Sequence, residues 1–287
     1  MRVAAVQMTT GLDREANRQA VRRAVGEATA GGTGVDLVVL PEATMATFGD
    51  QVTDLVPLAE PLDGPFVGTL AQLAAGTGAT IVAGMFEIAT PTEAAAGKVR
   101  NSVVAVGPDG LIGAYRKLHL YDALGWRESD RISPGDPVAD QVLVFPVDDL
   151  VVGVMNCYDL RFPEMARRLV DAGATVLVEP AHWINGPGKA DTWTTLLRAR
   201  AIESTAYVVA AAKPEPECAG HSMVVDPMGQ VLAAMDGVGA GQIVADLSAE
   251  RIAEVRQVLP VLANRRFSVV PRPGPVAPGQ GPWRRPS

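Results

Sequence analysis

A cysteine stands where the sequence predicts a buried strand followed by a helix. Cys157 follows the apolar residues 150–155, and Pro163 and Glu164 come shortly after it. The β-branched residues predict a strand, while proline at a first helical position and glutamate in a first turn predict a helix from Pro163. A thiol at such a turn is expected to have a lowered pKa, because the positive end of the helix favours the thiolate. The alternative is a cysteine of the hydrophobic core, since free cysteine is among the most buried residue types.

Two further residues with suitable chemistry also follow predicted strands. Glu42 comes after the predicted strand 36–40 and a proline, and Lys117 follows the predicted strand 111–115. Loops beyond the carboxyl ends of strands are the usual place for functional residues in α/β proteins. A carboxylate, an ammonium group and a thiol therefore all lie where a functional site is expected.

The elements that must position these residues alternate between strands and helices. Buried or hairpin strands are predicted at 3–8, 36–40, 80–85, 102–106, 111–115, 142–147, 150–155, 176–179, 206–212, 222–225, 231–235 and 243–247. Helices are predicted at about 13–28, 67–75, 165–172, 190–204 and 248–258. Residues 121–137 lack periodicity and predict a long loop, which in a compact domain is often functional. This alternation predicts an α/β fold with a mixed sheet system.

Composition narrows the classes of function. With 287 residues, of which 48% are hydrophobic, the chain can bury one sizeable core. We assign residues 1–270 to one domain and the residues 271–287, rich in Pro and Gly, to a tail without a core of its own. The formal charge of −7 argues against nucleic acid as a partner. Two cysteines do not make a disulfide framework.

The sequence also indicates where the protein is located and whether it needs a metal. No apolar run approaches the length that crosses a membrane, and the first residues predict a strand rather than a signal peptide. We therefore expect a cytoplasmic protein with no membrane partner. The three histidines are scattered along the chain, so neither a metal site nor a cofactor is expected.

Three motifs in the same order carry a family resemblance. They are Leu-Pro-Glu ending at Glu42, Tyr-Arg-Lys-Leu-His-Leu around Lys117, and Asn-Cys-Tyr-Asp-Leu-Arg-Phe-Pro-Glu around Cys157. Together they resemble the nitrilase superfamily of carbon–nitrogen hydrolases, and the resemblance extends from residue 1 to 270, including 222–229 and the Asn-Arg-Arg at 264–266. It implies a four-layer αββα sandwich that forms homodimers through its outer helices, and a catalytic triad of Glu42, Lys117 and Cys157.

The implied triad suits amide hydrolysis. Cys157 would attack the carbonyl carbon, and Glu42 would take the thiol proton and later activate water. Lys117 would stabilise the oxyanion of the tetrahedral intermediate, together with the backbone N–H of Tyr158. The resemblance also matches Glu128 to a second glutamate of related amidases, which would position the substrate amide and Lys117. A carboxylate on the surface is the alternative for Glu128.

Other residues are candidates for the pocket or for structural roles. Tyr121, His182 and Trp183 lie at a loop start or a strand end and are candidate substrate-binding residues, with packing as the alternative. His119 is expected to anchor the loop after the lysine by hydrogen bonding. The turn after the cysteine is expected to be stabilised by a pair between Asp159 and Arg161. Cys218 is expected to have no function and a thiol pKa near the usual value of about 8.5.

The function expected from the resemblance is a metal-independent thiol amidohydrolase that acts on a small linear amide and releases ammonia. The motifs and the compact length look most like the branch of ω-amidases and deaminated-glutathione amidases. The alternatives are an N-carbamoyl or ureido-acid amidohydrolase, a nitrilase, and a catalytically idle member that acts as a binding protein. Specificity is expected to lie in the loops 121–136 and 183–189.

Overall fold

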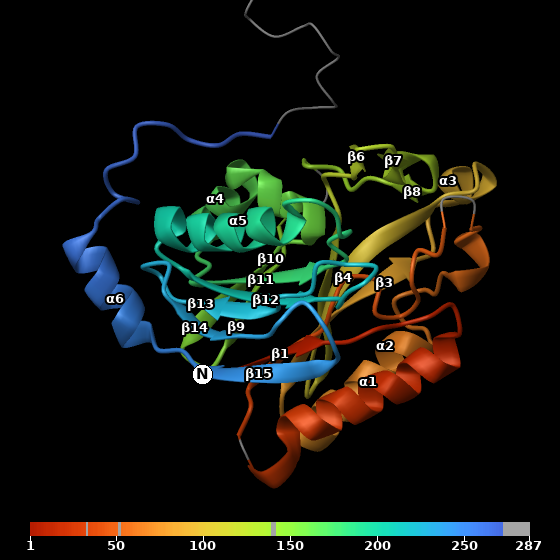
Figure 1. Ribbon diagram of the computed structural model, residues 1–287, viewed down its shortest axis with the longest axis horizontal. Helices are drawn as coiled ribbons and strands as arrows, with labels where there is room; N and C mark the ends of the chain where they lie inside the picture. Colours follow the sequence, from red (N-terminus) through yellow and green to blue (C-terminus); the bar gives the residue numbers. More distant parts are fainter. Residues whose placement is uncertain (33, 51–52, 139–141, 272–287) are drawn as a thin grey trace, which may run out of the picture.

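Two β-sheets pack face to face between two layers of helices, as Figure 1 shows. The computed structural model describes residues 1–32, 34–50, 53–138 and 142–271. The first sheet has the order β15-β1-β2-β3-β4-β5, with β8 paired to β4, and the second has the order β14-β13-β12-β11-β10-β9. This is the αββα sandwich that the family resemblance implies.

Each sheet is built from strands that are separated in the sequence. The first sheet contains β1 (Arg2–Gln7), β2 (Leu37–Val39), β3 (Thr80–Glu87), β4 (Val99–Gly107), β5 (Gly110–Arg116), β8 (Ile132–Ser133) and β15 (Gly241–Asp246). The second contains β9 (Val144–Val147), β10 (Leu150–Val154), β11 (Val176–Ala181), β12 (Tyr207–Ala212), β13 (Met223–Val225) and β14 (Val231–Ala234). A small separate pair is formed by β6 (Asp122–Ala123) and β7 (Trp126–Arg127).

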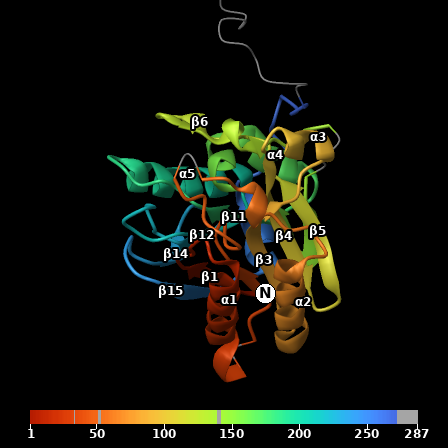
Figure 2. The same cartoon turned by 90° about the vertical axis from the view of Figure 1, so that its right-hand side faces the viewer.

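The helices cover the outer faces of the two sheets. Helices α1 (Arg14–Thr29) and α2 (Pro65–Thr77) lie side by side on the first sheet, as Figure 2 shows, and α4 (Pro163–Asp171) and α5 (Lys189–Ser204) cover the second. The short α3 (Pro91–Ala95) precedes β4, and α6 (Ala249–Val258) follows β15. No helix in the described part of the chain is long and apolar enough to span a membrane.

Strand β1 shows why the central strands are continuous apolar runs. Val3 and Ala5 belong to the core between the sheets, whereas Ala4 and Val6 belong to the core beneath α1 and α2. Successive side chains of a strand point to opposite faces, so a sheet covered on both sides needs apolar residues at every position. The same alternation holds for Leu37 and Val38 of β2, which confirms the buried strands that the sequence predicts.

Several predicted elements have different bounds in the structure. The strand predicted at 80–85 continues to Glu87, and the helix predicted from 67 begins at Pro65, because proline is well suited to the first helical turn. The predicted loop 121–137 contains β6, β7, a 3₁₀ turn at Glu128–Asp130 and β8. Residues 272–287, which hold nearly all of the predicted tail, lie outside the described ranges.

Candidate active site

The three residues singled out by the motifs meet at one end of the sandwich. Glu42 follows β2, Lys117 follows β5 and Cys157 follows β10, and all three line one cavity. Their exposed fractions are only 1%, 2% and 7%. Lys117 Nζ lies 2.8 Å from Glu42 Oε1. A carboxylate, an ammonium group and a thiol are therefore held together away from bulk water.

Glu42 is fixed by hydrogen bonds at both carboxylate oxygens. Its Oε1 accepts from Lys117 Nζ and from Asn101 Nδ2 at 2.7 Å, and its Oε2 accepts from the backbone N–H of His182 at 2.9 Å. Burial by itself would raise the pKa of Glu42, but the charge and hydrogen bond of Lys117, with smaller contributions from His182 and Asn101, lower it to about 2. Glu42 is therefore an ionised, well-oriented base at neutral pH.

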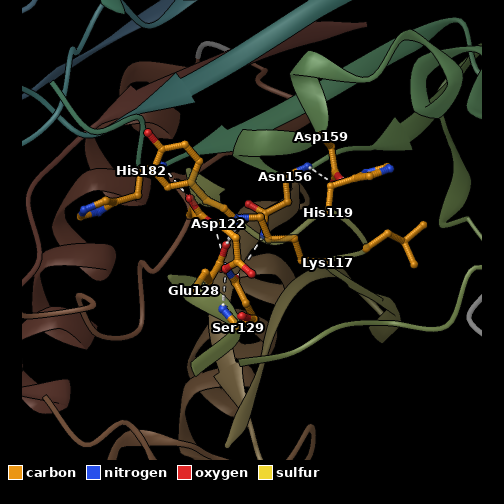
Figure 3. Close-up of polar contacts among 12 residues, drawn as sticks. Lys117, His119, Asp122, Glu128, Ser129, Asn156, Asp159 and His182 are labelled. Carbon is orange, nitrogen blue, oxygen red and sulfur yellow. Dashed lines mark hydrogen bonds and ion pairs between the residues drawn. The ribbon is translucent and has the colours of Figure 1, made fainter. Parts of the chain in front are cut away.

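Glu128 is the second carboxylate in contact with Lys117 (Figure 3). Lys117 Nζ lies 3.0 Å from Glu128 Oε2, which also accepts the backbone N–H of Tyr121 at 2.7 Å, and Asn101 Nδ2 donates to Glu128 Oε1 at 2.8 Å. Only 2% of Glu128 is exposed, so the alternative of a surface carboxylate is wrong. Burial raises the pKa of Glu128, and Glu42 raises it further, while Lys117 opposes both.

The lysine remains charged in this environment. Burial would lower the pKa of Lys117, but the carboxylates of Glu128 and Glu42 raise it well above its usual value. A permanent ammonium group bound by two carboxylates has a fixed position. It can therefore act as a preorganised stabiliser of negative charge in the cavity.

Cys157 occupies a backbone conformation that is unusual for a residue other than glycine. Its φ is 52°, and it opens a 3₁₀ turn that spans Cys157–Arg161. Asp159 stabilises this turn, because its carboxylate accepts hydrogen bonds from the backbone N–H of Asn156 at 3.0 Å and from Tyr115 Oη at 2.7 Å. His119 Nδ1 lies 2.6 Å from the same carboxylate, as Figure 3 shows. Sparsely populated backbone conformations persist only where surrounding contacts fix them. Here the contacts of Asp159 fix the conformation that directs the Cys157 thiol to the cavity.

The partners of Asp159 confirm one structural prediction and correct another. His119 anchors its loop by hydrogen bonding, as predicted. The predicted pair of Asp159 with Arg161 is wrong, because Asp159 is bound by Tyr115 and His119, and the guanidinium of Arg161 lies over the ring of Trp183. The carboxylate of this buried aspartate is therefore bound by its own turn, by β5 and by the loop after Lys117.

The predicted pKa values of both cysteines are wrong. Burial raises the pKa of Cys157 well above its usual value, Glu42 raises it further, and Lys117 only partly opposes them. The turn after Cys157 is a short 3₁₀ segment, and α4 begins only at Pro163, so the stabilisation expected from a helix N-terminus is small beside these effects. Cys218 is fully buried, and burial likewise raises its pKa. The resting nucleophile candidate is thus a protonated thiol beside an ionised carboxylate.

The candidate substrate-binding residues also line the cavity. Tyr121, Tyr158, His182 and Trp183 surround it together with Phe48, Trp126 and Ile184. His182 Nε2 lies 3.2 Å from Glu217 Oε1, and burial lowers the pKa of His182. The cavity encloses about 30 Å³, room for about two water molecules, and opens to solvent at its mouth.

Sequence reasoning missed two polar residues near the site, and it included Lys189 only as the end of the predicted specificity loop 183–189. Asn101 on β4 joins Glu42 to Glu128, and its Oδ1 accepts from Asn156 Nδ2 at 3.1 Å. Lys189, the first residue of α5, lines the cavity. Glu179 on β11 is fully buried, and burial, with Asp159 and Glu42, raises its pKa well above its usual value. A polar residue inside an otherwise apolar strand was the available signal for Glu179, whereas Asn101 stands between Arg100 and Ser102 and carries no such signal.

Comparison with known proteins identifies the family. The model of the family described as carbon-nitrogen hydrolase matches residues 2–257. A deaminated glutathione amidase of Escherichia coli O157:H7 is 40% identical over 235 residues, covering 82% of this chain and 86% of the relative. A protein of Mycobacterium tuberculosis H37Rv, named only as a hydrolase, is 38% identical and covers 92% of this chain and 95% of the relative.

A solved structure agrees with these sequence matches. A CN-hydrolase superfamily protein from Xanthomonas campestris, crystallised with an arsenic adduct in its active site, superposes with a TM-score of 0.81 at 28% identity. The match covers 94% of this chain and 99% of that one. The chain therefore belongs to the carbon–nitrogen hydrolase family, the nitrilase superfamily, as a hydrolase that acts on carbon–nitrogen bonds.

Proposed function

We propose that the protein hydrolyses a small linear amide through a thioester on Cys157, with release of ammonia and a carboxylic acid. The observation that carries this proposal is the buried contact of Lys117 with Glu42 in the cavity that also contains Cys157. The name of the Escherichia coli relative, an amidase, supports the same class of substrate. A binding protein without catalysis would gain nothing from burying these charges, because buried ion pairs are costly to desolvate.

In the first half of the reaction, the Cys157 sulfur attacks the amide carbon while Glu42 takes the thiol proton. The raised pKa of the thiol means that the proton leaves only as the new carbon–sulfur bond forms. The carbonyl oxygen then carries negative charge, which the Lys117 ammonium and the backbone N–H of Tyr158 stabilise. Collapse of this intermediate breaks the carbon–nitrogen bond, and Glu42 returns the proton to the departing ammonia.

In the second half, water hydrolyses the thioester. Glu42 takes a proton from the water, whose oxygen attacks the thioester carbon, and the second tetrahedral intermediate is stabilised by the same donors. The carbon–sulfur bond then breaks, the sulfur recovers its proton and the carboxylic acid leaves. Glu128 holds the lysine in position throughout, because its carboxylate contacts Nζ at 3.0 Å.

The proposal is tested by trapping the acyl-enzyme. Rapid quenching of the wild type during turnover should let mass spectrometry detect an acyl group on Cys157, and Glu42→Gln, which keeps the shape of the side chain but lacks the base, should form or hydrolyse that group slowly. The mass increase should be absent in Cys157→Ala, which should also have no measurable turnover. Full turnover by Cys157→Ala, or a stable acyl group on another residue, would refute the mechanism.

The type of bond is tested by product release. Wild-type protein is incubated with primary amides, with N-carbamoyl amino acids and with nitriles, and both ammonia and carbon dioxide are measured. We expect ammonia without carbon dioxide from a primary amide. Release of both gases from a carbamoyl acid, with no turnover of amides, would instead indicate a carbamoyl amidohydrolase.

A further inference from the structure

A buried lysine near Glu42 has no part in the proposed reaction. Lys213 directly follows β12 of the second sheet, and its side chain is almost fully buried. Its Nζ donates to a neutral hydroxyl, Thr10 Oγ1, at 2.6 Å, and burial lowers its pKa. A buried charge is costly to desolvate, and one hydrogen bond to a hydroxyl offsets only part of that cost. Stability alone therefore does not explain a lysine at this position.

The hydroxyl of Thr10 links Lys213 to the segment that carries Glu42. Thr10 Oγ1 donates to the backbone carbonyl of Ala43 at 2.9 Å. Because an ammonium group can only donate, it takes an acceptor site of the hydroxyl and leaves the hydroxyl proton for this carbonyl. Lys213, Thr10 and the Ala43 carbonyl thus form a relay of two hydrogen bonds, which ends one residue after Glu42.

The backbone of Ala43 needs contacts of this kind. Its φ is 53°, in the left-handed region that residues other than glycine seldom adopt. Such a conformation persists only where the surrounding structure determines it. On one side of Glu42, the carbonyl of Pro41 accepts from Thr44 Oγ1 at 2.6 Å and from the backbone N–H of Gly84 at 3.2 Å. On the other side, the relay fixes the carbonyl of Ala43.

Lys213 also supports the residue that binds the Glu42 carboxylate. The backbone N–H of Lys213 donates to the carbonyl of Ala181 at 3.2 Å, at the end of the pairing between β11 and β12. The next residue, His182, donates its backbone N–H to Glu42 Oε2 at 2.9 Å. Lys213 is therefore joined to both sides of the base: to the strand end that binds its carboxylate and, through Thr10, to the backbone that follows it.

We propose that Lys213 is a positioning residue, which holds Glu42 in the orientation for proton transfer by linking its segment to the second sheet through Thr10. Among the residues that the structure describes, Lys213 is not one of those that line the cavity, so it acts through Glu42 rather than on the substrate. This inference deepens the proposed function, because it rests on Glu42 as the general base.

Two variants break the relay at different atoms. Lys213→Met removes the ammonium group and keeps an unbranched apolar side chain, whereas Thr10→Val removes the hydroxyl and keeps the lysine with its charge. Each should lower kcat for a primary amide about 10-fold and leave KM within about twofold, because Glu42 transfers protons and does not bind substrate. The loss stays moderate because three hydrogen bonds to the Glu42 carboxylate remain.

Further variants separate the relay from general damage to the fold. Thr10→Ser keeps the hydroxyl and should retain kcat within about twofold. The double variant Lys213→Met/Thr10→Val should be no slower than the slower single variant, since both changes break the same relay. Thr69→Val is the matched control, because this buried threonine of α2 donates to the carbonyl of Pro65 and should leave kcat unchanged. Wild-type kcat in Lys213→Met, or losses that multiply in the double variant, would overturn the proposal.

A measurement without turnover lets this proposal and the proposed function fail independently. Hydrogen exchange of the His182 amide, followed by NMR, reports how firmly that N–H is bound by Glu42 Oε2. In Lys213→Met this amide should exchange roughly 10-fold faster than in wild type, while the amides of β10 exchange no faster. That result would support the role of Lys213 even if wild type hydrolyses no amide, which would refute only the proposed function. Unchanged or slower exchange at His182 would overturn the role of Lys213, whatever the kinetics.

Discussion

At the scale of single residues, the site contains more buried negative charge than positive charge. Glu42 and Glu128 share one ammonium group, that of Lys117, and Asn101 donates to both carboxylates. The pKa of Glu42 falls to about 2, whereas that of Glu128 is raised. The lysine is therefore both the expected oxyanion stabiliser and the charge on which the stability of this buried cluster depends.

This double dependence leads to a prediction for Lys117→Met. Turnover should fall at least roughly 100- to 1,000-fold, as for the loss of one oxyanion donor. The protein should also be destabilised by roughly 3–5 kcal/mol, because two buried carboxylates lose their counter-ion. The double variant Lys117→Met/Glu128→Gln should recover part of that stability but no activity, in denaturant titrations and ammonia assays. Recovery of activity in the double variant would remove the lysine from catalysis.

Lys213 permits a prediction about pH. This residue follows β12, and only 2% of it is exposed. Its Nζ donates to Thr10 Oγ1 at 2.6 Å, and burial lowers its pKa from 10.5 to about 8. Between these values the unfolded chain binds the proton and the folded chain does not, so folding stability rises with pH in this window. Below pH 8 the amine of Lys213 is charged in both the folded and the unfolded state. The folded state is then destabilised by the full free-energy cost of burying that charge.

Replacing the lysine should therefore stabilise the protein at neutral pH. We expect Lys213→Met to raise the free energy of unfolding by roughly 1–3 kcal/mol at pH 7, after allowing for the lost hydrogen bond to Thr10. The difference from wild type should shrink toward pH 10. Denaturant titrations of both proteins at the two pH values measure it, and a difference that does not change with pH would contradict the assigned pKa.

At the scale of elements, strand β3 restricts where Glu42, the proposed general base, can lie. A Cβ added to Gly84 would lie 2.5 Å from the backbone nitrogen of Ala43 and 2.7 Å from Glu42 Cα. These are backbone atoms, so the segment that carries Glu42 would have to move. Gly68 in α2 has no heavy atom within 4 Å of the corresponding position.

The two glycines form a matched pair of variants. Gly84→Ala should reduce kcat roughly 100-fold, because a displacement of about 1 Å is enough to misplace a catalytic group. It should also cost about 1–3 kcal/mol of stability through overpacking. Gly68→Ala should leave kcat unchanged and stabilise the helix by up to about 1 kcal/mol. Similar kinetics for both variants would show that the contact of β3 with Glu42 is not critical.

The sequence predicts the positions of the reactive groups better than it predicts their surroundings. Runs of β-branched residues indicate the strands, so the residue pattern alone places Glu42, Lys117 and Cys157 at strand ends. The raised pKa of Cys157 was missed because it depends on burial and on a carboxylate far away in the chain. The sequence places Lys189 at the end of a loop expected to carry specificity, but the position of its side chain in the cavity depends on how that loop folds back onto Trp183.

At the scale of the whole molecule, we propose that the protein is at least a homodimer. The motivation is the family relationship, which implies association through the outer helices. Sedimentation velocity at micromolar concentration should give a mass of about twice that of one chain or more. A stable and active monomer at that concentration would contradict this expectation.

The contacts around Glu42 have a consequence for the synthesis of the chain. Its carboxylate accepts a hydrogen bond from the backbone N–H of His182, which lies 140 positions later in the chain. Asn101 is hydrogen-bonded to Asn156, which lies 55 positions later. Such distant contacts close large loops and form late in folding. A nascent chain on the ribosome that ends before residue 182 therefore has the carboxylate and the lysine, but no finished site. We therefore expect hydrolysis to begin only when both sheets have been made and packed together, so that enzymatic activity would report completed folding rather than the formation of either half.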